Sequence, residues 1–322
     1  MKNKRVLLID ALNLFIRNYI VDPSLSTNGH PIGGTKGFIK SLQAVCRIIN
    51  PDLIFVAWDG GSQKRKSMDK NYKAGRKPVR LNRDIHNMTA GEQEDNKNWQ
   101  QERIIEYLNQ LPILQSYVEN VEADDIIALV SQSQALSEHH KIILSSDKDF
   151  IQLCDDTTIL YRPIQKEILN KKRILEQFQI HPTNFALARA IAGDKSDNLP
   201  GVGGAGLATI SKRFPFLSEE KAYTIQELVD YAENADSKLK VFKNIIENKD
   251  LIEKNYKMMQ LYAPCISAQS AQHIRGMLKN PSLMFNKTGV RTMMMIDGFG
   301  TYDTTDLFAQ FRKMVVQSKE DK

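Results

Sequence analysis

The stretch Val6-Leu7-Leu8-Ile9-Asp10 is a run of four apolar residues that ends on a carboxylate. The arrangement recurs: Ile54 to Trp58 precedes Asp59, and Ile142 to Leu144 is followed closely by Asp147. Short continuous apolar runs are typical of strands that are buried on both faces of a parallel sheet. Ligands bind at the carboxyl ends of such strands, so the sequence predicts that these acids gather at one edge of a sheet.

Nine acidic residues form five short clusters, most of them where a predicted strand ends or a predicted helix begins. They are Asp10, Asp59, the group Glu122, Asp124 and Asp125, the pair Asp147 and Asp149, and the pair Asp194 and Asp197. Carboxylates that converge on one edge repel one another unless cations lie between them. Oxygen ligands suit hard ions, and no Cys/His cluster competes for zinc, so the sequence predicts a site for several Mg²⁺ or Mn²⁺ ions.

Each cluster also has a structural interpretation. Asp10 at a strand end can be a helix N-cap, and Asp59 before two glycines can be a turn residue. Acids in the first turn of a helix are favoured by its dipole, but three carboxylates between Glu122 and Asp125 exceed what a helix start requires. The occurrence of all five clusters in one chain favours the metal site.

The composition is that of a globular chain with a basic surface. Its 322 residues include 42% hydrophobic and 25% charged residues, and the formal net charge is +6. With nine acids gathered in one site, the remaining surface is more basic than this total, which fits a polyanionic substrate. The three cysteines, Cys46, Cys154 and Cys265, have no paired spacing, which argues for a reducing compartment. Without a signal-peptide core or a membrane-spanning apolar run, a cytoplasmic protein is expected.

Strand and helix signals alternate through the first half of the chain. Strands are expected near 5–10, 53–58, 113–118, 141–145 and 158–162, and helices near 13–20, 35–49, 99–110 and from 123 onward. This alternation predicts an α/β fold with a mostly parallel central sheet flanked by helices. The polar, basic stretch at about 60–98 is expected to form an arch. Helical periodicity takes over beyond 165, which predicts a core over 1–165 and a helical region over 166–322.

A glycine-rich segment, Gly201-Val202-Gly203-Gly204-Ala205-Gly206, follows Asp197-Asn198-Leu199-Pro200. Glycines at this density let the backbone approach a phosphate, and the helix that follows presents free N–H groups to an anion. No strand precedes the segment and no Gly-Lys-Ser/Thr follows it, which excludes a dinucleotide fingerprint and an ATPase phosphate loop. Two helices joined by such a hairpin, over about 183–213, are typical of a sequence-independent clamp on the DNA backbone.

The stretch at 60–98 is rich in cations, and for most of them a solvated loop is explanation enough. They include Lys64, Arg65, Lys66, Lys70, Lys73, Arg76, Lys77, Arg80 and Arg83. Tyr72-Lys73-Ala74-Gly75-Arg76 is more specific, because an aromatic ring beside two cations can stack a base while the cations hold phosphates.

In this order the motifs resemble the 5′-nuclease superfamily of flap endonucleases and 5′-to-3′ exonucleases. Within it, the chain is most similar to the bacteriophage replication enzymes and to the 5′-nuclease domain of bacterial DNA polymerase I. The matching elements run from about residue 5 to about residue 213. They are Leu8-Ile9-Asp10, Ala57-Trp58-Asp59, Arg65 with Tyr72-Lys73-Ala74-Gly75-Arg76, Glu122-Ala123-Asp124-Asp125, Ser146-Asp147-Lys148-Asp149, and Gly193-Asp194-Lys195-Ser196-Asp197-Asn198 leading into Gly201-Val202.

The resemblance implies a PIN-like nuclease domain with a helical arch and a helix-three-turn-helix DNA-binding subdomain. It assigns an inner shell around the catalytic ions to Asp10, Asp59, Glu122, Asp124, Asp147 and Asp149. It assigns a second ion, held partly through water, to Asp125, Asp194 and Asp197. Lys73 and Arg76 match catalytic cations at the base of the arch that contact the scissile phosphate.

The DNA-binding positions implied by the resemblance are Arg65, Tyr72, Gly201, Val202, Gly204, Gly206 and Lys212. Tyr72 matches a position that stacks on a base. Family clamps often carry a lysine two residues after the last hairpin glycine, but Ala208 stands there in this chain. Lys212 or Arg213 is the expected replacement.

The implied function is a metal-dependent 5′-to-3′ exonuclease and structure-specific flap endonuclease that hydrolyses DNA during replication, with RNA–DNA primers as a further candidate substrate. The implied cofactors are two or more Mg²⁺ ions, for which Mn²⁺ substitutes, and K⁺ held by carbonyl groups of the hairpin. The expected partners are DNA with 5′ ends, flaps or RNA primers, and a single-strand-binding protein or sliding clamp. A monomer is expected, in the host cytoplasm if the chain is viral.

Three alternatives are weighed against this function. A PIN-type ribonuclease is usually shorter and lacks the glycine-rich clamp. A catalytically silent structure-specific DNA-binding protein would have a broken acid set, whereas here every position is filled. A phosphatase with Asp10 as nucleophile would want a second Asp two residues later, where this chain has Leu12.

Overall fold

The computed structural model describes residues 4–76, 88–235 and 239–320, which form a six-stranded sheet with helices around it. The strands are β1 (Arg5–Asp10), β2 (Leu53–Trp58), β3 (Leu114–Tyr117), β4 (His140–Leu144), β5 (Thr158–Arg162) and β6 (Glu167–Leu169). Their order is β3-β2-β1-β4-β5-β6, and every pairing is parallel except that of β5 with β6. The predicted mostly parallel α/β sheet is confirmed.

β1 lies inside the sheet, with β2 on one side and β4 on the other. Asp10 pairs with Ala57 of β2 on one side, and Ile9 pairs with Leu144 of β4 on the other. The strand order reverses between β1 and β4. This is the topological switch point, where a crevice forms at the carboxyl ends of a parallel sheet. Asp10 and the segment after β4 therefore meet at the crevice.

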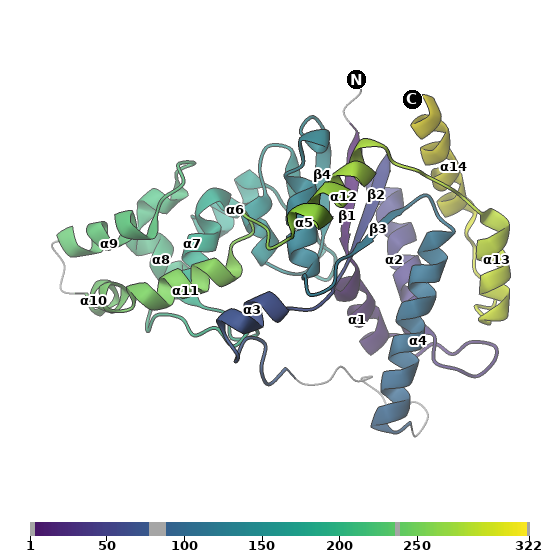
Figure 1. Ribbon diagram of the computed structural model, residues 1–322, viewed down its shortest axis with the longest axis horizontal. Coiled ribbons are helices and arrows are strands. Elements are labelled where there is room, and N and C mark those ends of the chain that lie inside the picture. Colours follow the sequence, from purple (N-terminus) through teal and green to yellow (C-terminus); the bar gives the residue numbers. More distant parts are fainter. Residues whose placement is uncertain (1–3, 77–87, 236–238, 321–322) are drawn as a thin grey trace.

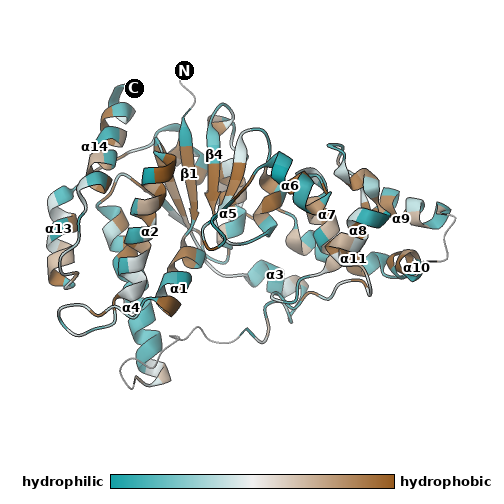
Figure 2. Cartoon of the chain, turned by 180° about the vertical axis from the view of Figure 1, so that it is seen from behind, coloured by the Kyte–Doolittle hydropathy of each residue, from teal (hydrophilic) through white to brown (hydrophobic). Residues whose placement is uncertain are grey.

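The central strands are buried on both faces, and Figure 2 shows them brown, between helices with teal outer surfaces. Val6 and Leu8 belong to one hydrophobic core, and Leu7 and Ile9 to the other, as the alternation of side chains along a strand requires. The first core is covered by α5 (Ala123–Ser131) and α12 (Ala268–Lys279). The second is covered by α1 (Ala11–Val21), α2 (Gly33–Ile49), α4 (Ala90–Asn109), α13 (Lys287–Ile296) and α14 (Thr305–Glu320).

The remaining helices of the second half form an arm that extends to one side of the sheet (Figure 1). They are α6 (Lys171–Phe178), α7 (Pro182–Ala192), α8 (Leu207–Arg213), α9 (Ile225–Asn234), α10 (Lys240–Glu247) and α11 (Lys249–Met259). The first core runs from β1 into this arm through Phe185, Ile210 and Ile252, so the arm and the sheet share one apolar interior. None of the helices described is both long and apolar enough to cross a membrane.

The structure differs from the predicted boundary at residue 165. β6 at 167–169 still belongs to the sheet, and α13 and α14 return to pack on its second face, where Phe308 and Phe311 are buried. Region 166–322 is therefore not one separate helical unit. Helical periodicity predicts each helix but carries no information about the sheet face on which it docks. Met293 to Ile296 is helical, with Met294 in the core and Ile296 exposed.

Part of the predicted arch is regular helix. α3 (Gln63–Met68) is followed by turns up to Arg76, and α4 begins at Ala90 behind a capping box of Thr89 and Glu92. α4 starts well before the expected 99, because its first half is polar on all sides and shows no apolar period. Residues 77–87, with Lys77, Arg80 and Arg83, lie outside the described residues.

Candidate metal centre and nucleic-acid interface

Asp10 is held in place at the end of β1 by two hydrogen bonds. Its Oδ1 accepts the backbone N–H of Asn13 at 3.1 Å, and its Oδ2 accepts the Ser145 hydroxyl at 2.9 Å. Asp10 is therefore the N-cap of α1 as well as a member of the acidic site. Asn13 in turn accepts the N–H of Ser146 at 3.1 Å, which fastens the loop after β4 to α1.

Four more carboxylates come to the same crevice. Asp147 and Asp149 follow β4, and Asp147 Oδ1 accepts the Asp149 N–H at 2.9 Å. Asp59 follows β2 and accepts the Gly61 N–H at 2.8 Å, so it also fulfils its predicted turn role. Asp124 lies in the first turn of α5. We call Asp10, Asp59, Asp124, Asp147 and Asp149 the carboxylate cluster.

The charges of the carboxylate cluster act on one another. Burial, together with the charges of Asp147 and Asp59, raises the pKa of Asp10 to about 7 although its hydrogen bonds lower it. Burial, followed by the charge of Asp147, raises the pKa of Asp149 to about 7. The pKa of Asp124 is raised well above its ordinary value by burial and by the charges of Asp147 and Asp10. These shifts arise when several carboxylates share one enclosed space.

The donor set fits divalent metal ions. It consists of carboxylate oxygens, and within the described residues Asp10, Asp59, Asp124 and Asp147 have no ion-pair partner. Hard ions with oxygen ligands supply the missing positive charge. In this conformation, however, no three acidic, histidine or cysteine side chains of the described residues are arranged to enclose an ion. Protein cations stand beside the cluster and fill the space.

Arg65 is the innermost of these cations, and only 6% of its surface is exposed. Its Nη1 donates to the carboxylates of Glu122 and Asp125, and its Nε donates to the Met258 carbonyl of α11 at 2.8 Å. The guanidinium is thus enclosed and its charge is paired inside the protein, and the contact of Arg65 with DNA stays a prediction.

Asp125 is a hydrogen-bond and ion-pair partner of Arg65. One of its carboxylate oxygens accepts from Arg65 at 2.7 Å, and the other accepts the Cys265 N–H at 2.8 Å. Both oxygens thus accept from protein donors, and only 1% of the residue is exposed. Asp125 has a structural role in this conformation, and its predicted role in holding a metal ion stays a prediction.

Tyr72 is also buried, with 4% of its surface exposed. Its hydroxyl lies 3.2 Å from a Glu122 oxygen and 3.1 Å from an Asp197 oxygen, so it bridges two acids from distant segments. The ring is enclosed by the protein in this conformation, and the stacking of Tyr72 on a base stays a prediction. Local sequence shows an aromatic ring beside cations, but it does not show which way the ring points.

Lys73 and Arg76 lie at the rim of the site. Lys73 donates to Glu122, and Arg76 donates to Asp197 and, at 3.3 Å, to the Ser196 carbonyl. Burial lowers the pKa of Lys73, but the charges of Glu122, Asp124 and Asp197 outweigh it and leave the pKa above its usual value. The backbone of Lys73 is left-handed, with φ 56°, a conformation that costs a non-glycine residue about 1 kcal/mol.

Asp194 and Asp197 belong to the loop after α7. Arg189, in the last turn of α7, donates hydrogen bonds to Asp194 and, at 2.9 Å, to Asp149. It therefore links Asp194 to the carboxylate cluster. Burial raises the pKa of Asp194, but Ser196 and Arg189 lower it below the ordinary range. A cavity of about 10 Å³ is left between Arg65, Tyr72 and the acids, so the protein cations close the site.

The predicted helix-hairpin-helix consists of α7, the segment 193–206 and α8. Gly193 has φ 73°, and a side chain on Gly201 would lie 2.0 Å from the Ala192 carbonyl oxygen. Gly201 is thus needed for backbone packing inside the hairpin, and Val202 is buried with 5% exposure. Gly201 itself is exposed, and the predicted DNA contacts of Gly201 and Val202 stay predictions.

The tip of the hairpin is open. Gly204, at φ 80°, and Gly206, the N-cap of α8, have no atom within 4 Å of where a side chain would begin. Lys212 is exposed at the end of α8. Asn255 of α11 donates to the Ala190 and Pro200 carbonyls at 2.9 and 2.8 Å, which holds the root of the hairpin in place.

Comparison with known proteins identifies the family. Residues 5–179 match the model of the 5′-3′ exonuclease, N-terminal resolvase-like domain. The chain belongs to this family of nucleases. The predicted resemblance, and with it the prediction of an enzyme, is confirmed.

Curated relatives of this 5′-3′ exonuclease family cover most of the chain. A 5′-3′ exonuclease of Aquifex aeolicus is 25% identical over 284 residues, 87% of this chain and 89% of the relative. The flap endonuclease Xni of a Shewanella species is 27% identical over 80% of this chain and 90% of its own. A thermostable DNA polymerase I of Thermus thermophilus is 30% identical over 65% of this chain, which corresponds to 23% of that polymerase.

A solved structure shows the same fold. The 5′-exonuclease of bacteriophage T5, described with bound divalent zinc ions, superposes with a TM-score of 0.65 at 18% identity, over 91% of this chain and all of that one. A variant of the D15 flap endonuclease of bacteriophage T5, in a pseudo-enzyme-product complex with DNA and metal ions, superposes with the same TM-score of 0.65 at 17% identity. The predicted PIN-like 5′-nuclease architecture is confirmed by this likeness.

Two functional side chains of this 5′-3′ exonuclease fold were missed in the sequence. Arg189 links Asp149 to Asp194, and its only signal was a cation in the last turn of the helix before Asp194. Asn13 fastens the loop after β4, and its signal was its place in the motif Asp10-Ala11-Leu12-Asn13. A hydrogen-bonding role for Asn13 could have been inferred from that motif, whereas the Arg189 pairing depends on the folded arm.

Proposed function

We propose that this chain is a divalent-metal-dependent 5′-to-3′ exonuclease and structure-specific flap endonuclease that hydrolyses DNA, and RNA–DNA primers, during replication. The observation that carries the proposal is the carboxylate cluster at the switch point of the sheet. Asp10 is buried and the other acids are half-buried, and burial together with neighbouring negative charge raises the pKa of Asp10, Asp124 and Asp149. An arrangement that costs stability without a bound cation is expected at a functional site.

The ions assigned to the cluster are Mg²⁺, with Mn²⁺ as a substitute, and K⁺ is assigned to the carbonyl groups of the hairpin. When bound, two divalent ions would supply Lewis acidity for the attacking water, the reacting phosphate and the leaving oxygen. Asp10, fixed by Ser145 and Asn13, and Asp147 are the residues best placed to hold them.

The chain's own cations orient the DNA. Lys73 and Arg76 stand at the rim of the cluster, where their charge stabilises a phosphate as it becomes more negative. Both must leave Glu122 and Asp197 to reach that phosphate. Lys73 and Arg76 stay paired with these two carboxylates until DNA binds. The phosphate of the DNA then competes with the carboxylates for the same cations.

Cleavage of 5′-labelled substrates tests the proposed function. Flapped, nicked and RNA-primed duplexes are incubated with Mg²⁺, with Mn²⁺ and with a chelator. Product release from the 5′ end with either metal, and none with the chelator, is expected. Cleavage of single-stranded RNA in preference to every DNA substrate would favour the PIN-type ribonuclease. Tight binding without cleavage under all conditions would favour the catalytically silent DNA-binding protein.

Metal binding is expected to depend on pH through the carboxylate cluster. Asp10 and Asp149 have pKa values of about 7 in the fold against 3.8 ordinarily, so the folded state binds more protons between these values. The metal-free protein therefore loses stability as pH rises through this window. Divalent ions compete with those protons, so Mg²⁺ should raise the melting temperature more at about pH 8 than at about pH 5. An equal rise at both pH values would contradict the assignment.

The hairpin is expected to bind duplex DNA through its open tip. A valine at Gly204 would strain the backbone, which has φ 80° there, whereas Gly206 has φ −71° and free space around it. Gly206→Val should therefore fold normally and weaken duplex binding roughly tenfold for every sequence, equivalent to about 1.4 kcal/mol. Because a backbone clamp releases counterions, the variant's affinity should also depend less steeply on salt.

The control for this variant is Gly276→Val on α12, a glycine that also has no atom within 4 Å. Titrations of labelled duplexes over a range of salt concentrations give both affinities and slopes. Wild-type duplex affinity in Gly206→Val would show that the hairpin is only a connector between helices.

A further inference from the structure

A hollow of about 540 Å³ opens between α8, α9 and α10 of the arm, and it shares no residue with the carboxylate cluster. One wall is aromatic. The Tyr231 ring lies 5.5 Å from that of Phe214 and 4.9 Å from that of Phe216, and these contacts fix its position. Tyr231 nevertheless remains 41% exposed. A rigid ring thus presents part of its surface to the hollow.

Two cations stand at the hollow, Lys212 and Arg213, in the last turn of α8. Neither has an acidic partner in the described part of the chain, whereas several other lysines of this arm do. Lys221, for example, pairs with Glu227 at 2.6 Å, and Lys243 pairs with Glu247 at 3.6 Å. Among the described residues, no acid therefore competes with an anion for Lys212 and Arg213.

The hollow continues the surface of the hairpin. Ala208 and Lys212 are four residues apart on α8 and lie on one face of it, directly after Gly206. The seven residues of α8 span about 10 Å at a rise of ~1.5 Å per residue. A duplex strand advances ~3.4 Å per nucleotide, so the hollow lies about three nucleotides from the tip of the hairpin.

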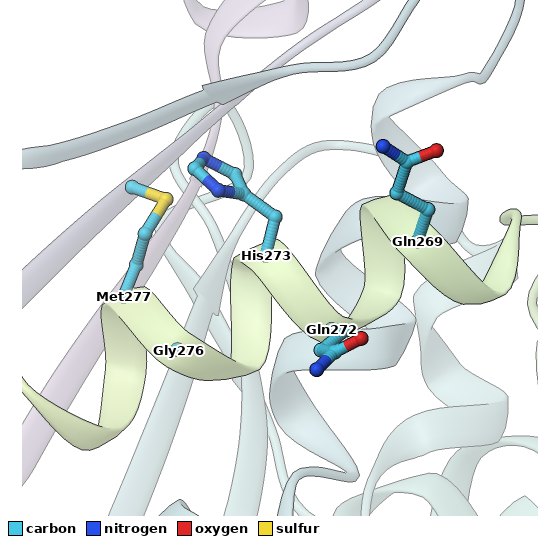
Figure 3. Close-up of a pocket in the computed structure, with 5 residues that line it drawn as sticks. All are labelled: Gln269, Gln272, His273, Gly276 and Met277. Carbon is cyan, nitrogen blue, oxygen red and sulfur yellow. The ribbon is translucent and has the colours of Figure 1, made fainter.

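A second hollow on the protein lacks this chemistry. It measures about 480 Å³ and lies on the outer face of α12 (Figure 3). Gln269, Gln272, His273, Gly276 and Met277 line it, without a lysine, an arginine or an exposed Tyr, Phe or Trp. This hollow offers neither an aromatic ring on which a base could stack nor a cation that could hold a phosphate.

We propose that the hollow between α8, α9 and α10 binds one unpaired nucleotide of the DNA held by the hairpin, with its base on Tyr231 and its phosphate at Lys212 and Arg213. The proposal rests on the proposed function, because the hairpin must first hold the DNA. Aromatic rings stack on any base, and adjacent cations hold the backbone. A base inside a duplex is stacked between its neighbours and cannot enter, so the site selects DNA with an unpaired position near the clamp.

The test is a binding experiment in the presence of a chelator, so that cleavage does not interfere. A set of duplexes carries a single unpaired 2-aminopurine at successive positions along one strand or the other. Wild-type protein should bind one of them roughly tenfold more tightly than the fully paired duplex, within the range for one stacked base. The fluorescence of that base should be quenched on binding.

Three variants separate the site from the fold. Tyr231→Leu should remove both the preference and the quenching. The double variant Lys212→Gln/Arg213→Gln leaves the aromatic residues unchanged and should lower affinity at the preferred position with a smaller salt slope. Lys221→Gln, on the same arm but outside the hollow, should keep the preference.

The outcomes distinguish this site from the proposed function. Equal affinity for all positions, or a preference that survives Tyr231→Leu and the double variant, would overturn the site and leave the nuclease intact. Failure to bind any duplex would overturn the hairpin clamp and the site together.

Discussion

Asp147→Asn is expected to lower the cleavage rate at least about a thousandfold while changing DNA affinity only a few-fold. The Asp147 charge raises the pKa of Asp10, Asp124 and Asp149, so it lies within reach of the other acids of the cluster. An amide keeps the shape and can still accept the Asp149 N–H, which the carboxylate accepts at 2.9 Å. The variant therefore loses charge for holding the ions and little else.

The same substitution is expected to stabilise the metal-free protein. It removes one like charge from a group of buried carboxylates, so the melting temperature in a chelator should rise while the increase on adding Mg²⁺ should shrink. A stabilised but inactive variant is typical of sites that keep unfavourable charge for function.

Asp156→Asn is the matched control, since this carboxylate is exposed and pairs only with Lys171 at 3.2 Å in the described structure. Single-turnover rates, duplex titrations and melting curves for both variants give the comparison. Wild-type turnover in Asp147→Asn would remove Asp147 from the metal centre.

The fold was predictable because strands that are buried on both faces leave an unambiguous pattern. Four apolar residues before Asp10 and five before Asp59 can only be accommodated inside a sheet, and parallel order follows from the helices between them. The packing of the C-terminal helices α13 and α14 on the second face of the sheet was not predictable from such a pattern. The period of α14 shows that one face is apolar but does not specify that this face packs against α2.

The acids of the site were predictable for a similar reason, and their partners were not. A carboxylate after a strand is placed by the strand, so Asp10 and Asp147 could be brought together from sequence alone. The position of Arg65 depends on its hydrogen bond to the carbonyl of Met258, 193 residues further along the chain, and no local sequence pattern predicts that contact. The cations around Glu122 were consequently interpreted as a DNA surface, whereas in the fold they enclose the acids.

Lys73→Ala is expected to reduce the single-turnover rate by about 10²–10³, a loss of about 2.7–4 kcal/mol that is typical for one electrostatic donor. The Lys73 ammonium is paired with Glu122 at the rim of the carboxylate cluster, where a reacting phosphate would gain charge. Glu122 keeps Arg65 and Tyr72 as partners when Lys73 is removed, so the site should stay folded. The left-handed backbone with φ 56° remains equally unfavourable for alanine, which isolates the contribution of the side chain.

Lys66→Ala provides the control for charge alone, because Lys66 is exposed on α3 in the same basic segment. The rate at saturating enzyme and the affinity for a flap substrate are measured separately for both variants. Lys66→Ala should change only affinity, and by little, since one exposed cation contributes one phosphate contact. If Lys73→Ala behaved in the same way, with a normal rate at saturation, Lys73 would be a backbone contact, and the positive charge at the transition state would have to come from Arg76, which donates to Asp197 across the same rim.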